Sequence, residues 1–136
     1  MQEVSGDPKP ISPEGLIGGA AASPDGRLAA VVSGKGMMLD VSGSEPKPIS
    51  GLIQDDYVVG WTADGRSIYV VRGELRAEVS IVDVVSGART TWKTLAPSDR
   101  AGLSAVNSIR ISPDGKSYAY SYTRVLSELY LVDGIR

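Results

Sequence analysis

A repeated pattern constrains the fold of this chain more than any other feature of its sequence. Each copy has an Asp-Gly step, then a run rich in Tyr and Val, then a second apolar run that ends in Asp. The Asp-Gly steps begin at Asp25, Asp64 and Asp114, which are 39 and then 50 residues apart. The pattern therefore predicts three copies of one supersecondary unit.

Each copy is expected to consist of β-strands. Apolar and aromatic residues alternate with a period of two at 68–73 and 118–123, and no window carries a sustained helical stripe. In Ser-Pro-Asp-Gly the proline and the glycine suit a tight turn, and aspartate can bond its own backbone there. We therefore interpret Asp25, Asp64 and Asp114 as hairpin turn residues and not as cation ligands.

The spacing of the copies predicts a β-propeller, because a blade takes about 40 to 50 residues. Residues 45–52 and 88–95 supply a fourth strand to the first two copies, and prolines in 45–52 favour an edge strand. We expect an all-β fold with three four-stranded antiparallel blades per chain, half of a six-bladed propeller. The expected ranges are a spare outer strand at 1–13 and blades at 14–50, 51–99 and 100–136, the last lacking its own outer strand.

The repeat resembles the TolB-like propeller repeat, a relative of the WD repeat. The resemblance rests on Ser-Pro-Asp-Gly-Arg/Lys, the following Tyr/Val strand and the closing Leu-Tyr-Leu-Val-Asp at 129–133. It implies a propeller with four antiparallel strands per blade, often six blades, as in TolB-type proteins and in the sensor regions of bacterial proteins such as some serine/threonine kinases. The chain shows neither kinase motifs nor a Gly-x-Ser-x-Gly elbow.

Composition excludes several function classes. The chain has no His and no Cys, which rules out a Ser-His-Asp triad, a Cys nucleophile and thiolate or imidazole zinc. With 14 basic and 16 acidic residues, its net charge of −2 argues against a nucleic-acid partner. No signal peptide or membrane-spanning run is apparent, and the compartment is left open. We expect no enzyme activity, no metal and no cofactor.

The number of strands expected in each blade predicts that two chains close one ring. The segment at 4–12 repeats the fourth-strand sequence before the first blade, while the third blade lacks that strand. We expect the strand of one chain to complete the last blade of its partner in a homodimer. The expected interface residues are Pro8, Lys9, Pro10 and Ile11 of one chain and Leu129, Tyr130 and Leu131 of the other.

Four loops vary in length and charge and are expected to share one face: 53–57, 72–78, 97–104 and 123–127. Binding residues concentrate on such loops of a rigid scaffold. The candidate binding residues on this face are all charged: Asp55, Asp56, Arg72, Glu74, Arg76, Arg100 and Arg124. The alternative is that they are ordinary solvated surface charges, which is the usual state of long charged side chains. No acidic loop motif surrounds Asp55 and Asp56 to complete a calcium site. Glycoside hydrolysis by Glu74 and Glu78 needs a defined carboxylate separation and a sugar cleft, which the sequence does not indicate.

Aromatic residues admit two interpretations as well. Trp61, Trp92 and the row at 118–122 can stack on sugars or bases, or pack blades together, and we favour packing. The expected function is a non-catalytic protein-interaction or ligand-sensing module, part of a larger bacterial protein such as a propeller-bearing kinase. The alternatives are a carboxylate-based propeller glycosidase or lyase, and a half-propeller that serves as a self-assembling scaffold.

Overall fold

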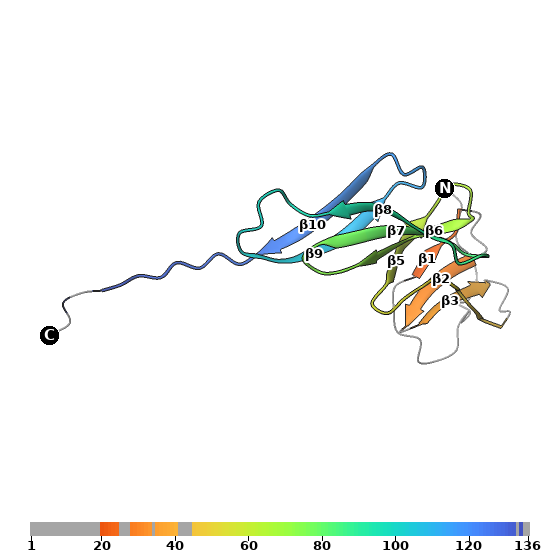
Figure 1. Cartoon of the computed structure of the whole chain (residues 1–136), viewed down its shortest axis with the longest axis horizontal. Helices are drawn as coiled ribbons and strands as arrows, with labels where there is room; N and C mark the ends of the chain where they lie inside the picture. The colour runs from red at the N-terminus through yellow and green to blue at the C-terminus, as the bar shows by residue number, and fades with distance from the viewer. Residues whose placement is uncertain (1–19, 25–27, 34, 41–44, 133, 135–136) are drawn as a thin grey trace, which may run out of the picture.

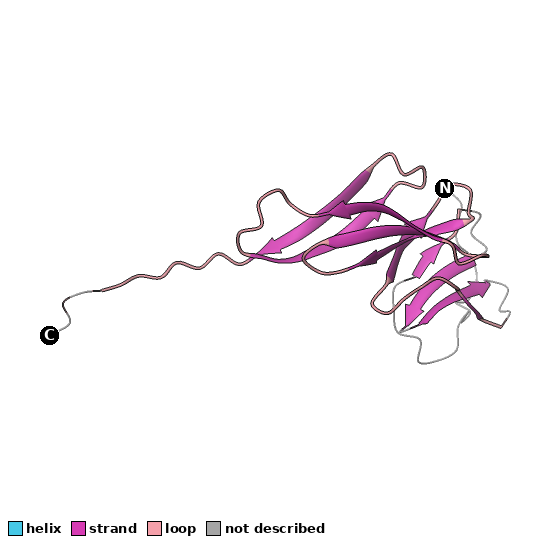
Figure 2. Ribbon diagram, in the orientation of Figure 1, coloured by secondary structure: helices cyan, strands magenta, loops and turns pink. Residues whose placement is uncertain are grey.

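The computed structural model describes residues 20–24, 28–33, 35–40, 45–132 and 134. Over these residues the chain is all-β, with strands and turns and no helix (Figure 2). The strands run in chain order: β1 (Ala20–Ala22), β2 (Leu28–Ser33), β3 (Lys35–Asp40), β4 (Lys47–Pro48), β5 (Tyr57–Trp61), β6 (Ser67–Arg72), β7 (Ala77–Asp83), β8 (Arg89–Leu95), β9 (Leu103–Ile111) and β10 (Tyr118–Arg124). The all-β expectation is confirmed for this part of the chain.

The strands form three antiparallel sheets, each made of consecutive strands (Figure 1). The first sheet has the order β1-β2-β3-β4, the second β5-β6-β7-β8, and the third pairs β9 with β10. The expected fourth strands are present as β4 and β8, and β4 is an edge strand, as expected for a strand that contains Pro48. In the second sheet the register runs from Ser67 opposite Asp83 to Arg72 opposite Glu78.

The Asp-Gly turns of the second and third sheets have the same hydrogen bonds. The Asp64 carboxylate accepts from the Thr62 hydroxyl and from the Arg66 amide, at 2.6 and 3.0 Å. The Asp114 carboxylate accepts in the same way from Ser112 and Lys116, at 2.5 and 3.0 Å. The turn interpretation is therefore confirmed at Asp64 and Asp114, whereas Asp25 lies outside the described residues.

The second sheet is buried on both faces. Because side chains alternate along a strand, Ile68, Val70 and Val82 form one buried cluster, which also contacts Ala21 and Met38 of the first sheet. On the opposite face, apolar residues of β6, β7 and β8 join residues of β9 and β10. The second cluster consists of Tyr69, Val71, Ala77, Val79, Leu95, Val106 and Ile109. The core therefore lies between neighbouring sheets.

Aromatic side chains take part in this packing. Trp61 is buried, and its indole N–H donates to the carbonyl oxygen of Ala21 in the first sheet over 2.8 Å. Trp92 makes edge contacts with Tyr69 and Tyr118, with ring centroids 5.6 and 5.9 Å apart. The packing interpretation is confirmed for these contacts.

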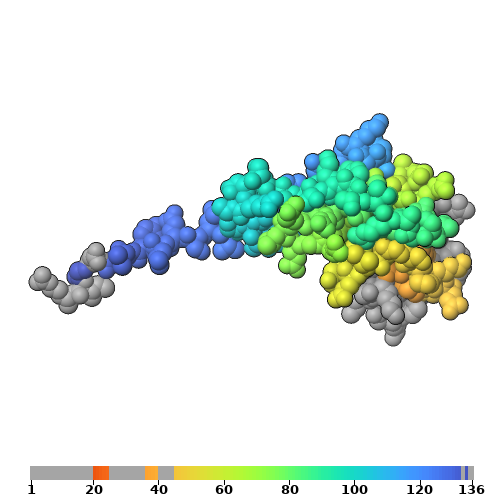
Figure 3. Space-filling model, viewed as in Figure 1, coloured from red at the N-terminus to blue at the C-terminus, as the bar shows by residue number. Residues whose placement is uncertain are grey.

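The chain departs from the expected pattern after β10. Residues 129–132, expected to form the next strand, are extended and unpaired, and the segment leaves the body of the molecule (Figures 1 and 3). The segment does not turn back because β10 stays paired with β9 to its end, where Arg124 lies opposite Leu103. The amide of Val125, the next residue, donates to the Gly102 carbonyl oxygen. The backbone that would turn back is held straight by these bonds.

Candidate functional site

A groove of about 480 Å³ lies between the second and third sheets, at the β6–β7 turn. Its lining comes from Tyr57 at the start of β5, from Gly73 and Glu74 in the turn, and from residues 105–108 of β9. The amide of Val106 donates to the carbonyl oxygen of Glu74 over 2.6 Å, which fixes the turn beside β9. The β6–β7 turn of the second sheet and β9 of the third sheet thus contribute to one surface.

Two described non-glycine residues have backbone in the left-handed region, and one of them lines this groove. Ser108 lines it with a φ of 48°, and Asp55, two residues before Tyr57, has a φ of 66°. Non-glycine residues seldom adopt this conformation, and it concentrates at functional sites. Ser108 lies in a β-bulge, because the register of β9 against β10 shifts between Ala119 and Ser121.

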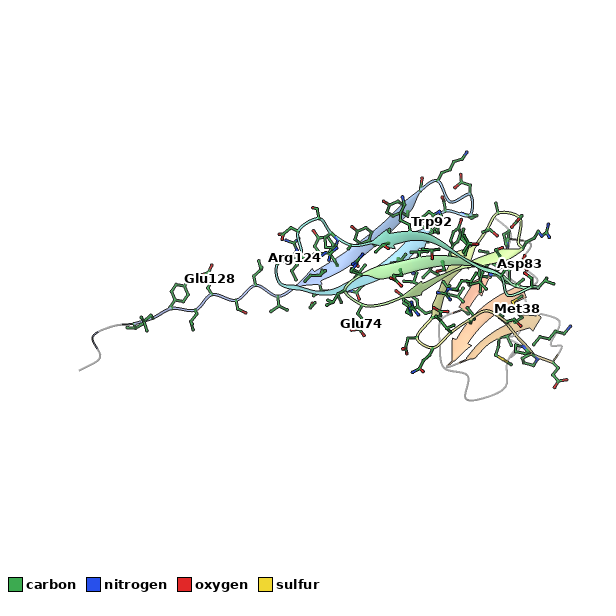
Figure 4. All side chains as sticks on the ribbon, in the orientation of Figure 1. Met38, Glu74, Asp83, Trp92, Arg124 and Glu128 are labelled. Carbon is green, nitrogen blue, oxygen red and sulfur yellow. The ribbon has the colours of Figure 1, made fainter. Side chains whose placement is uncertain are left out.

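The side chains in the groove can donate and accept hydrogen bonds. Burial raises the pKa of the Tyr57 phenol above its ordinary value, so the hydroxyl is a neutral donor at physiological pH. The Asn107 amide nitrogen donates to the Thr123 hydroxyl over 3.2 Å, which directs the side chain and leaves its carbonyl oxygen available. Glu74 adds an exposed carboxylate, which points away from the sheets (Figure 4).

Asp56 has a structural partner instead of an open coordination site. Its buried carboxylate receives two hydrogen bonds from the Arg89 guanidinium of β8, at 2.6 and 3.1 Å, and one from the Ile53 amide at 2.9 Å. Such bidentate pairs are strong and geometrically specific. Asp56 therefore ties the loop before β5 to the outer strand of the same sheet.

Two further candidate arginines are also paired. Arg72 contacts Glu78 across the β6–β7 hairpin at 3.0 Å, with both side chains largely exposed. Arg124, at the end of β10, contacts the Asp99 carboxylate at 2.9 Å and also donates to the Asp99 carbonyl oxygen. The second pair joins the loop after β8 to the end of β10.

The remaining candidates are exposed and unpaired. Within the described part of the chain, no hydrogen bond or ion pair engages the side chains of Asp55, Glu74, Arg76 and Arg100. The seven predicted binding residues are thus divided between structural ion pairs and free surface charges. Only Glu74 lines the groove.

Several exposed carboxylates have pKa values below the ordinary range. Hydrogen bonds from Thr62 and Ser112 are the largest cause for Asp64 and Asp114, and the Ala101 amide is the largest for Asp99, followed by the charge of Arg124. These bonds belong to turns and loops and hold local backbone in place. They do not mark an acid–base site.

The expected dimer residues fall in two groups. Pro8, Lys9, Pro10 and Ile11 lie outside the described residues. On the other side, Leu129, Tyr130 and Leu131 are 99%, 77% and 88% exposed. This run of uncovered apolar side chains is unusual for a folded surface.

Tyr57, Asn107 and Ser108 were not among the predicted binding residues, although Tyr57 falls within the predicted loop 53–57. Nothing in the sequence marks Ser108, because a bulge is set by pairing with a distant strand. The Asp56–Arg89 pair was missed for the same reason, since its members are 33 residues apart.

No three acidic side chains gather as metal ligands within the described ranges. Over those ranges no helix is long and apolar enough to cross a membrane.

The chain matches no protein-family model and no curated protein. The fold alone defines the class of this protein, which is an all-β protein of antiparallel sheets that pack against one another.

Proposed function

We propose that the chain is a non-catalytic binding module with the architecture of a β-propeller. The observation that carries this proposal is the burial of the second sheet on both faces, one by the first sheet and one by the third. Propeller blades are stacked in this way, each one covering its neighbour. The repeated turns and strands give the same interpretation independently.

The binding surface in this proposal is the groove together with the charged loops beside it. It offers a phenol, an amide oxygen and a carboxylate, held on strands and on a turn that is bonded to β9. Binding groups on a rigid scaffold are typical of interaction modules. A catalytic role has less support, because Asp56 is engaged by Arg89 and Glu78 by Arg72.

In this proposal the ring is completed by a second copy of the chain. Among the described strands none pairs with the outer edge of β10 in the third sheet, and an apolar segment follows β10. Two sets of three repeats make a ring of six, and residues 8–12 of each chain would add a strand beside residues 129–132 of the other. Contacts of this kind are isologous and extensive.

Deletion of residues 1–13 tests ring closure. We expect the truncated chain to lose self-association or to aggregate, because the blade edge of its partner stays uncovered. The measurement is molar mass by light scattering at micromolar concentration, compared with the intact chain. If both proteins have the same molar mass and remain folded, residues 1–13 do not close the ring.

A further inference from the structure

β10 has an edge that no described strand pairs with. In the third sheet, β10 bonds to β9 on one side only. In the second sheet, β6 occupies the corresponding position and is paired on both sides, by β5 and by β7. The free edge of β10 therefore corresponds to the edge of β6 that receives β7.

The second and third sheets correspond residue by residue with an offset of 50. In the second sheet, Gly60 lies opposite Tyr69, just after a shift in register. In the third sheet, Arg110 lies opposite Ala119, again at a shift in register, and both numbers are higher by 50. The hydrogen bonds of the two Asp-Gly turns follow the same offset.

The offset extends into the apolar segment after β10. Glu128 corresponds to Glu78, and the four residues that follow, Leu129, Tyr130, Leu131 and Val132, correspond to Val79, Ser80, Ile81 and Val82 of β7. Val79 and Val82 are fully buried, whereas Leu129 and Val132 are 99% and 70% exposed. The segment has the sequence of an inner strand but none of its contacts.

We propose that residues 128–132 dock on the free edge of β10 in the same chain, in the register that β7 has on β6. Adding 50 to the β6–β7 pairs sets Tyr122 opposite Glu128, Ser121 opposite Leu129, Tyr120 opposite Tyr130, Ala119 opposite Leu131, and Tyr118 opposite Val132. The structure describes the undocked arrangement of this strand. The docking concerns a single chain and goes beyond ring closure, because it requires no second copy.

The connection is long enough for docking within one chain. Five residues, 73–77, separate the last paired residues Arg72 and Glu78 of the second sheet, and five, 123–127, separate Tyr122 from Glu128. The main-chain groups of β10 and of the segment would satisfy each other, as in strand addition to a sheet edge. A hollow of about 390 Å³ is lined by residues 110–112 and 117–119, and two of these, Tyr118 and Ala119 of β10, are opposite Val132 and Leu131 in this register.

The residues at 123–127 explain why the undocked arrangement of residues 128–132 competes with the docked one. Gly73 has a φ of +91°, and a Cβ there would meet the Arg76 carbonyl oxygen at 2.5 Å. Its counterpart is Thr123, which has a Cβ and instead pairs with Ala105. Together with the bonds of Arg124 to Asp99, this pairing favours a straight backbone after β10. Residues 128–132 are therefore a strand that exchanges between the docked and the undocked position.

Paired cysteines test the register, and the chain contains no other cysteine. The in-register variant is Ser121→Cys/Leu129→Cys, and the matched control is Ser121→Cys/Leu131→Cys, which displaces the second cysteine by two residues on the same strand face. A disulfide requires Cα atoms roughly 4.4–6.8 Å apart. We expect mild oxidation to form an intramolecular disulfide at least about tenfold faster in the in-register variant than in the control.

The other outcomes overturn the proposal. Equal rates in the two variants would exclude this register, and a disulfide between chains would assign the edge to the segment of a second copy. Amide hydrogen exchange of the unmodified chain provides an independent check without substitution. We expect residues 129–132 to exchange more slowly than a free peptide, and exchange at the free-peptide rate would contradict docking.

Discussion

Asp56 and Arg89 illustrate how a candidate binding residue becomes a structural one. The Asp56 carboxylate is fully buried, whereas the Arg89 side chain is 24% exposed. We expect Asp56→Asn to lower the free energy of unfolding by about 2–3 kcal/mol, since the amide keeps an acceptor for Ile53 but leaves the guanidinium without its counter-charge. Denaturant unfolding monitored by tryptophan fluorescence measures this change.

The neighbouring residue provides a matched control. Asp55 is exposed, and its φ of 66° is a conformation that asparagine also tolerates. Asp55→Asn should therefore change the free energy of unfolding by less than about 0.5 kcal/mol. Similar losses in the two variants would show that the ion pair with Arg89 does not stabilise the fold.

The turn carboxylates predict a response to acid. The pKa values of Asp64 and Asp114 are lowered in the folded chain, mainly by hydrogen bonds from Thr62 and Ser112. A lowered folded pKa gives stability that is present above the ordinary value of 3.8 and is lost as pH falls through the folded value. We expect the double variant Asp64→Asn/Asp114→Asn to lose less stability than the wild type on acidification below that value. Parallel stability curves would contradict this role.

At the scale of elements, the β6–β7 hairpin depends on a glycine. An added Cβ at Gly73 would meet the Arg76 carbonyl oxygen at 2.5 Å, and the residue has a φ of +91°. Gly73→Ala should lower the free energy of unfolding by about 1–3 kcal/mol. Gly60→Ala is the control, because a Cβ there comes no closer than 3.9 Å to Ile111. Thermal or denaturant unfolding that fails to distinguish the two variants would exclude backbone strain as the cause.

Local patterns predicted the elements well and the contacts between them poorly. The two-residue period and the turn residues identified β6, β10 and the turns at Asp64 and Asp114, because these depend on neighbours in the sequence. The predicted strand at 129–132 is not paired in the structure, since Arg124 and Val125 bond to distant residues that no local pattern reveals. The groove depends likewise on the approach of β9 to the β6–β7 turn, and Glu74 was the only candidate binding residue predicted among those that line it.

At the scale of the whole molecule, the described residues cover both faces of the second sheet but only one face of the third. The second sheet buries Val70 on one face and Val71 on the other, both at 0% exposure. The third sheet contacts the second through Val106 and Ile109 and is followed by an exposed apolar segment. This asymmetry is why the proposed propeller needs a second copy, since an apolar surface favours association.

The molar mass of the intact chain in solution tests ring closure most directly. Light scattering across a dilution series at micromolar concentrations distinguishes a closed pair from a single chain without any substitution. The proposed ring predicts a stable species with twice the 14.3 kDa mass of one chain. A well-folded monomer of 14.3 kDa throughout the series would contradict it.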